Sequence, residues 1–420
     1  MTTSDSSPRD AIVILQQPPN PMLPARLRPL YNRRKAIEAK AQSQAGTLEA
    51  VTGSLTRSLG RHLDEKVRLA PIGSGALPVM RARGDAEGMA ALRATEGVRA
   101  VIPNQPIKLI SPRASTMSIH QAGAQWRDWQ DHCGVTKAWG RSKGQGVKVA
   151  VLDTGVHAAH PGLGGCVENF VVIDPCRRLV EAKPYFDTDN HGTHVSGIIA
   201  GRGTDHFGVA PEVTLAVAVV LLGGSSVDTL VAGISWAIDQ GADVICMSLG
   251  FPYYEPLFDV VFENVLAQNV VPVVAIGNEY HGNTSSPGSC PHALGVGAVG
   301  WDGRVPQVAD FSSGASLTFP QQAKYVHKPD LVAPGVDILS TLPPPYDGAA
   351  PDYGAMSGTS MATPFVAGCA ALALAAKPNL PAADLVQLFR DTARHPTPNV
   401  RPDNRWGHGL IDVGDAISQL

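Results

Sequence analysis

Two nearly uninterrupted apolar runs stand out in the hydrophobic pattern of the chain. Residues 147–152 precede Asp153 and predict a buried parallel strand. Residues 365–376 form the longest apolar run and predict a buried helix. A further helix is predicted at 191–201, and residues 295–300 alternate like a strand. These elements predict an α/β fold whose large domain has a mostly parallel sheet flanked by helices.

The first 115 residues have a different pattern. They predict two helical stretches, 31–62 and 85–95, among short strands. The strands are expected at 11–15, 67–71, 76–81 and 98–102, and the middle two form a hairpin around two glycines. The order β-α-β-β-α-β is typical of a small α+β ferredoxin-like domain. We therefore divide the chain into this domain at 1–115, a small polar linker at 116–125 and the large domain at 126–420.

Composition is that of a folded protein of two domains, with 420 residues, 44% hydrophobic and 17% charged. No run reaches the ~18 apolar residues of a membrane span. The first ten residues lack a basic region and an apolar core, which favours the cytoplasm over secretion. Export by another route and a missing start both remain open.

Six cysteines are too few for a disulfide scaffold. Cys246 and Cys369 lie in apolar surroundings and are expected to be buried free thiols. Cys166 and Cys176 enclose a loop, and a disulfide between them stays open.

Charge divides the chain unequally. Residues 1–115 carry a net charge of +8 and the remainder −11, which favours docking of the first part on the second. A basic domain also suggests nucleic acid, but apart from residues 33–35 its cations are scattered, so we expect no nucleic-acid partner. The glycine pattern at 295–300 lies within a predicted strand, which argues against nucleotide binding.

Three polar residues occupy positions suited to catalysis. Ser360 lies between a glycine turn and the long apolar run, at the positive end of a helix dipole. Asp153 ends the apolar strand, where sites of α/β sheets form. The alternative role for Ser360 is that of an ordinary helix cap, and for Asp153 that of a residue capping a turn. His191 and His194 share a helical face, but no third ligand follows at zinc spacing, so we expect no metal there.

The three surrounding motifs are Asp-Thr-Gly at 153–155, His-Gly-Thr-His at 191–194 and Gly-Thr-Ser-Met-Ala-Thr-Pro at 358–364. They resemble, in order and in residues, the signatures of subtilisin-like serine proteases. Five connecting segments match too, at 208–211, 248–250, 275–278, 333–335 and 407–411. The resemblance spans about residue 125 to the C-terminus and implies a serine endopeptidase acting on protein or peptide substrates. It also makes the first domain similar to an inhibitory propeptide.

The resemblance assigns a role to each catalytic residue. Ser360 would attack the peptide carbonyl, His191 would take its proton, and Asp153 would orient the imidazole. Asn278 and the backbone N–H of Ser360 would stabilise the oxyanion. A lone asparagine in this setting is also a common turn residue.

An extended substrate would add as a strand between two glycine-containing segments. The first is Gly223, Gly224 and Ser225, and the second is Ser248, Leu249 and Gly250. Val227 and Leu230 would line an apolar pocket further along the substrate. The first pocket would be walled by Ala275, Ile276 and Gly277, with Ser285 near its floor. These small, uncharged residues predict a neutral or apolar side chain before the cleaved bond.

Many members of this family hold calcium with an aspartate that corresponds to Gly162 here and with a loop that is shortened here to 202–206. Calcium needs six to eight oxygen ligands, so we expect no tight site there. No cofactor is expected to be required, and a weaker calcium site elsewhere stays open. A peptide ligase on the same site and a non-catalytic peptide-binding relative are the competing functions.

Overall fold

The computed structural model describes residues 9–16, 67–174, 178–203, 208–319, 325–345 and 352–420, together with a few positions between 39 and 53. A nine-stranded sheet forms the centre of the large domain, in the order β15-β14-β13-β11-β7-β10-β8-β9, with β18 also paired to β14. All neighbours are parallel except β14 with β15 and β8 with β9. The predicted α/β fold is therefore confirmed. The sheet comprises β7 (Lys148–Asp153), β8 (Val167–Ile173), β9 (Leu179–Val180), β10 (Thr214–Val219), β11 (Val244–Met247), β13 (Val271–Ala275), β14 (Leu294–Asp302), β15 (Val305–Val308) and β18 (Leu331–Pro334).

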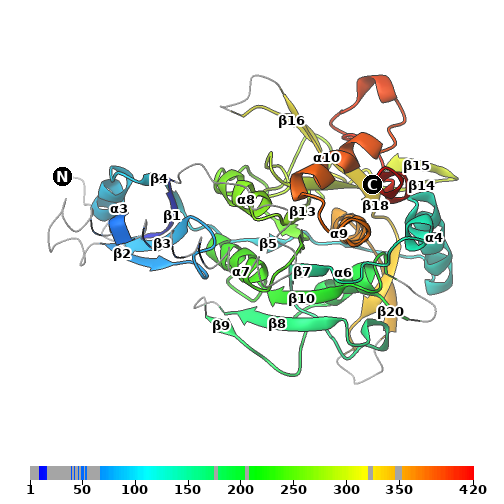
Figure 1. Cartoon of the computed structure of the whole chain (residues 1–420), viewed down its shortest axis with the longest axis horizontal. Coiled ribbons are helices and arrows are strands. Elements are labelled where there is room, and N and C mark those ends of the chain that lie inside the picture. The colour runs from blue at the N-terminus through cyan, green and yellow to red at the C-terminus, as the bar shows by residue number, and fades with distance from the viewer. Residues whose placement is uncertain are drawn as a thin grey trace.

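Helices cover both faces of this sheet (Figure 1). Strand β7 shows why, because its residues are all buried and alternate between two cores. Val149 and Val151 belong to the core beneath α6 and α9, whereas Ala150 and Leu152 belong to the core beneath α7 and α8. The helices are α4 (Ile119–His132), α5 (Val135–Trp139), α6 (His191–Ala200), α7 (Val227–Asp239), α8 (Leu257–Ala267), α9 (Thr359–Ala376), α10 (Ala382–Thr392) and α11 (Val413–Ser418).

Helix α9 contains the longest apolar run predicted from the sequence. Among the described residues it is the one helix long and apolar enough to pass a length-and-composition test for a membrane span. Inside the protein, 89% of that window is buried. It packs against α6 and the central strands and is the core helix that carries Ser360.

The first domain has a four-stranded antiparallel sheet in the order β2-β3-β1-β4, covered by one described helix. Its elements are β1 (Arg9–Leu15), β2 (Val67–Pro71), β3 (Val79–Gly84), α3 (Ala86–Arg93) and β4 (Val98–Pro103). Asp85 caps α3 by accepting from Gly88 N, as predicted. The order is that of a ferredoxin-like sheet, and the predicted helix at 31–62 lies largely outside the described residues.

Two of the boundaries that differ from those predicted have a clear structural reason. Strand β3 begins at Val79 rather than at residue 76, because Ala76 and Leu77 pack into the core beneath α7 and α8. Helix α4 begins at Ile119, inside the range assigned to the linker. Ser118 and Gln121 form a capping box there, a signal that the sequence contains and that we did not use.

The last residues of the range 1–115 run alongside the large domain as two short strands. Strand β5 (Lys108–Leu109) pairs antiparallel with β12 (Leu249–Gly250). Strand β6 (Arg113–Ala114) pairs with β20 (Asp352–Ser357), which in turn pairs with β19 (Ile338–Leu342). A separate two-stranded sheet joins β16 (Ala315–Leu317) and β17 (Val326–Lys328). Figure 1 shows β5 between the first domain and the centre of the large one.

Candidate active site

Asp153 and His191 form a buried pair at the carboxyl edge of the sheet. Asp153 ends β7, and His191 is the first residue of α6. His191 Nδ1 lies 2.8 Å from Asp153 Oδ1, and neither side chain is exposed. Burial opposes the charged imidazole, but the charge and hydrogen bond of Asp153, with the charges of Asp187 and Asp189, raise the pKa of His191 above its usual value. The pair is thus built to keep a proton on Nδ1 and to stabilise an imidazolium.

A second carboxylate, that of Asp187, joins the two motifs and was missed by our sequence reasoning. Its Oδ1 accepts from Thr154 Oγ1 at 2.6 Å, and its Oδ2 accepts from the N–H and the hydroxyl of Thr193 at 2.7 and 2.6 Å. Thr154 Oγ1 in turn accepts from Gly192 N at 2.9 Å. Burial, with the nearby charge of Asp153, raises the pKa of Asp187 despite these bonds. Asp187 therefore fixes the strand end that carries Asp153 relative to the helix that carries His191.

Ser360 is the second residue of α9 and faces the segment at the end of the range 1–115. Its Oγ donates to Ile110 O at 2.8 Å, with Ser248 O at 3.4 Å as a weaker acceptor. His191 Nε2 is buried without a hydrogen-bond partner among the described residues. The hydroxyl therefore contacts a peptide carbonyl rather than the imidazole. A hydroxyl that contacts its base only later in the reaction is common before catalysis.

Asn278 has its amide held in one orientation. Its Oδ1 accepts from the N–H and the hydroxyl of Thr359, both at 3.0 Å. This leaves Nδ2 to donate into the cleft, where it bonds Ser111 O at 3.0 Å. The carbonyl on Asn278 is thus one residue beyond the carbonyl on Ser360. Ser360 Oγ and Asn278 Nδ2 therefore contact two consecutive peptide carbonyls rather than the same one.

The segment before Ile110 lies between the two strands of protein that we predicted would hold substrate. Ile107 N donates to Ser225 O at 3.1 Å, and Val227 N donates to Gln105 O at 2.8 Å. On the other side, Leu109 and Lys108 stand opposite Leu249 and Gly250. Within the described part of the chain, no backbone hydrogen bond joins residues 105–110 to Gly223 or Gly224, which precede Ser225 in the same loop. The segment thus adds as a strand in a three-stranded arrangement.

Two side chains of this segment, those of Ile107 and Ile110, are buried, whereas Lys108 between them is exposed. Ile107 is 5% exposed and packs in one apolar cluster with Val227, Leu230 and Leu249. Ile110 is 6% exposed and borders a cavity of about 430 Å³. That cavity is also lined by Gly250 and Ser285, both predicted there, and by Glu279, which was not.

The three residues predicted as the wall of the first pocket, Ala275, Ile276 and Gly277, do not line this cavity. Ala275 and Ile276 have no exposed surface, and a Cβ on Gly277 would lie 2.5 Å from Ser285 Oγ. Ile276 O accepts from Ser285 N at 2.8 Å, so this segment adjoins the cavity through Ser285.

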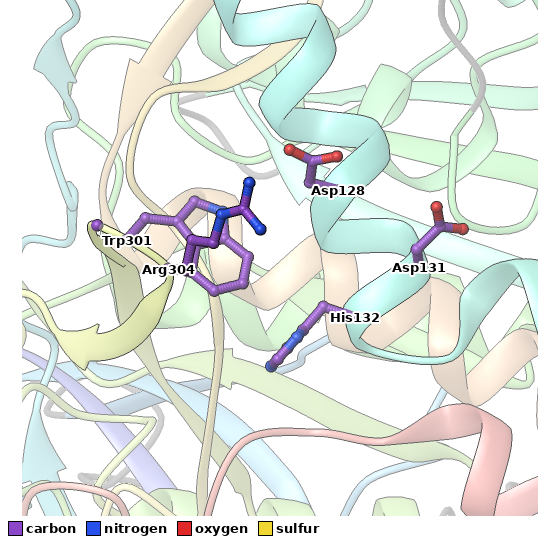
Figure 2. A pocket seen from close by; sticks show the side chains of 6 residues that line it. Asp128, Asp131, His132, Trp301 and Arg304 are labelled. Atoms are coloured by element: carbon purple, nitrogen blue, oxygen red, sulfur yellow. The ribbon is translucent and has the colours of Figure 1, made fainter.

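A larger cavity of about 590 Å³ lies elsewhere, between α4 and the β14–β15 turn (Figure 2). Asp128, Asp131, His132, Trp301 and Arg304 surround it. It shares no lining residue with the catalytic groups or with the strand-binding segments.

The region where relatives would hold calcium is occupied by protein groups. A Cβ on Gly162 would lie 2.5 Å from the Tyr353 hydroxyl, so a carboxylate does not fit there without movement. The Arg202 guanidinium donates to the carbonyls of Pro211, Val213 and Gly164 at 2.6, 2.8 and 3.2 Å. Residues 204–207 lie outside the described part of the chain. Within that part, no group of three metal-ligating side chains gathers.

Cys166 is a buried free thiol, which does not support the disulfide that we left open; Cys176 lies outside the described residues. Burial raises the pKa of the Cys166 thiol to about 11. Cys246 and Cys369 are buried free thiols, as predicted.

Comparison with known proteins decides the family. The profile of the subtilase family matches residues 144–409. The chain belongs to the subtilase family. This subtilase is 37% identical to subtilisin from Bacillus pumilus over 278 residues, which cover 64% of this chain and 90% of that protein. It is also 37% identical to subtilisin E from Bacillus subtilis, but spans only 65% of it. By this membership the chain is a serine endopeptidase.

Two further comparisons concern an intracellular relative and a solved structure. The intracellular serine protease of Paenibacillus polymyxa is 38% identical over 248 residues, covering 56% of this subtilase and 68% of the relative. Among solved structures, fervidolysin from Fervidobacterium pennivorans matches 99% of the chain with a TM-score of 0.71 at 23% identity. The subtilase spans 61% of that protein, and the likeness shows a shared fold.

Proposed function

We propose that this subtilase hydrolyses internal peptide bonds through Asp153, His191 and Ser360, and that residues 1–115 inhibit it within the same chain. The observation that carries the proposal is the 2.8 Å contact of Ser360 Oγ with the carbonyl of Ile110. That carbonyl belongs to a segment held as a strand on both sides, in the way a substrate would be.

The reaction follows from the positions of these groups. His191 Nε2, free of other partners, takes the Ser360 proton while Oγ attacks the carbonyl carbon. Asp153 holds the proton on Nδ1 and stabilises the imidazolium. Asn278 Nδ2 donates to the oxyanion, and His191 then protonates the leaving amine to give the acyl-enzyme. Water activated by the same imidazole releases the acid.

The favoured first cleavage is between Ile110 and Ser111. Ser360 contacts the carbonyl of Ile110, and the Ile110 side chain borders the predicted first pocket. The alternative carbonyl, that of Ser111, is bonded to the nitrogen of Pro112, whose ring crowds the leaving group. In the proposed reaction, Asn278 Nδ2 exchanges its bond to Ser111 O for a bond to the oxyanion that forms at Ile110 O.

Contacts between the two parts of the chain support inhibition by the first domain. Ile12, Ile14 and Leu77 lie in the same apolar core as α7 and α8. Arg81 forms an ion pair with the buried Asp228, with Nε 3.6 Å from Oδ2. Asn104 bonds both Asp228 N and Ser226 Oγ at the start of α7.

These contacts place the domain directly upstream of the occupied cleft. A folded body docked there holds its own C-terminal strand in the cleft at high effective concentration. We infer that residues 1–115 act as an intramolecular inhibitor, with residues 116–125 joining them to the large domain at 126–420.

A peptide ligase on the same site is the second candidate, because an acyl-enzyme can also be resolved by an amine. The test uses an organophosphorus serine reagent followed by peptide mapping, and mass analysis of the products of a defined peptide. We expect label on Ser360 alone and products that gain one water. Joined or cyclic products would favour the ligase, and an unlabelled protein that cuts nothing would favour a binding relative.

The steps proposed above need only side chains of the protein and water. That no cofactor is required remains our expectation from sequence.

A further inference from the structure

Beyond the cleaved bond, the chain places an arginine between two aromatic rings. The Arg113 guanidinium carbon lies 4.9 Å from the centre of the Phe311 ring and 5.4 Å from that of Tyr280. Its Nη2 also donates to the Tyr280 hydroxyl at 3.1 Å. Arg113 is the third residue after Ile110, on the leaving-group side of the proposed cleavage.

The backbone fixes Arg113 at this place. Arg113 stands opposite Ser357, and Ala114 stands opposite Met356, in the ladder between β6 and β20. One residue earlier, the chain passes over Gly358, where an added Cβ would meet Pro112 Cα at 3.5 Å. A peptide bound in this register therefore brings its third leaving-side residue to the two rings.

The backbones that carry the two rings are bonded to each other. Tyr280 N donates to Phe311 O at 3.0 Å, so the backbones that carry the rings are joined. Phe311 is 6% exposed, whereas Tyr280 is 56% exposed and stands at the surface. Tyr280 also has φ of 64°, an unusual conformation for a bulky residue. Such outliers persist where surrounding structure holds them, often at binding sites.

The chemistry of this place selects arginine. Among the described residues, no carboxylate lies within ion-pair distance of Arg113, so recognition does not depend on a simple charge pair. Planar guanidinium stacks on aromatic faces and donates to the phenol at once, whereas a lysine ammonium is a strongly hydrated point charge.

We propose that Tyr280 and Phe311 form a specificity subsite for arginine at the third position after the cleaved bond. The subsite rests on the proposed function, because that function defines the cleaved bond. It extends the expected preference from the apolar residue before the bond to a basic residue after it. Substrates of this subtilase would then combine an apolar side chain, as at Ile110, with an arginine three residues later.

The test uses peptides that copy residues 105–116, with protein expressed from the full chain. One peptide is native, two replace the arginine by alanine or lysine, and a fourth exchanges Arg113 with Ala114 so that composition is unchanged. We expect kcat/KM for the native peptide to exceed that for the alanine and exchanged peptides by about three- to tenfold, with lysine well below arginine.

Two variants of the protein test whether the Tyr280 side chain recognises the arginine. The ratio of native to alanine peptide should fall toward one in Tyr280→Ala and to an intermediate value in Tyr280→Phe, which keeps the ring and loses the hydroxyl. Equal cleavage of the arginine and lysine peptides, or a ratio unchanged in Tyr280→Ala, would overturn the subsite while leaving the protease intact. Failure to cut any of the peptides would overturn the proposed function as well.

Discussion

Replacing Arg202 by methionine should destabilise this subtilase, because the guanidinium bonds carbonyls from three separate positions. Methionine keeps the length and apolar stem of the side chain but removes the donors to Pro211 O, Val213 O and Gly164 O. The first two bonds are partly buried, and the third is exposed to solvent. Water can replace the third partner more readily than the others.

The size of the effect follows from the two partly buried bonds. A hydrogen bond from a charged donor contributes about 1.5–3 kcal/mol, and solvent access reduces this, so we expect a loss of about 2–5 kcal/mol in total. Residues 126–420 form a domain of 295 residues, whose entropy of unfolding is about 0.6 kcal/mol/K, so each kcal/mol lowers Tm by about 1.6 °C. The midpoint should therefore fall by about 3–8 °C.

The assay is thermal unfolding followed by circular dichroism, in a Ser360→Ala background that prevents self-digestion. Arg202→Lys is the matched control, since it keeps the charge and loses the planar fork, and it should fall between the parent and Arg202→Met. Chelator should change the midpoint of the parent by less than about 2 °C, because an absent ion leaves nothing to remove. A midpoint in Arg202→Met within 2 °C of the parent would refute the reasoning, as would a large loss with EDTA that calcium restores.

Three further predictions concern the catalytic site and the first domain. Ser360→Ala and His191→Ala should each lower kcat by at least ~10³-fold, and the double variant should be barely worse than either, because the triad acts as a unit; additive losses in peptide hydrolysis would argue against the assignment. Because the pKa of His191 is raised in the folded state, its protonation stabilises the folded chain. This contribution to the free energy of unfolding is complete below the unfolded-state pKa and is lost as pH rises through the folded-state pKa. In denaturant titrations, the stability advantage of Ser360→Ala over Ser360→Ala/His191→Gln should thus shrink as pH rises above the unfolded-state pKa of about 6.5, and a growing advantage would have the wrong sign. Residues 1–115 added in trans should inhibit the separated large domain less at 1 M than at 50 mM salt, because opposite charges of +8 and −11 are screened; a leader that neither binds nor inhibits at low salt would require another role for it.

Much of the catalytic site could be predicted because each residue sits at a boundary between elements. Asp153 ends an apolar strand, and Ser360 precedes an apolar helix, so local pattern places both on one edge of the sheet. Their meeting with His191 was implied by the resemblance to subtilases. The role of Asp187 was not foreseen, because its partners Thr154 and Thr193 come from two different motifs and only the tertiary fold brings them together.

The path of the chain through the cleft was only partly foreseen. The two strand-binding segments were implied by the resemblance to subtilases, and their glycines suit close approach, but Ser225 and Val227, rather than Gly223 and Gly224, supply the backbone bonds. The linker was assigned to 116–125 because its residues are small and polar. In the structure, the capping box at Ser118 begins α4 within it, and Arg113 and Ala114 just before it pair with β20. Such pairing depends on a partner hundreds of residues away, which local composition does not reveal.

The most direct test of the account is the intact mass and N-terminal sequence of the protein expressed from the full chain, wild type beside Ser360→Ala. We predict that the wild type separates into two fragments with a new N-terminus at Ser111, and that Ser360→Ala remains a single chain. An unprocessed wild type that still hydrolyses peptides would contradict the role of the segment at Ile110 as first substrate. Cleavage at the same bond in Ser360→Ala would contradict the assignment of Ser360 as the nucleophile.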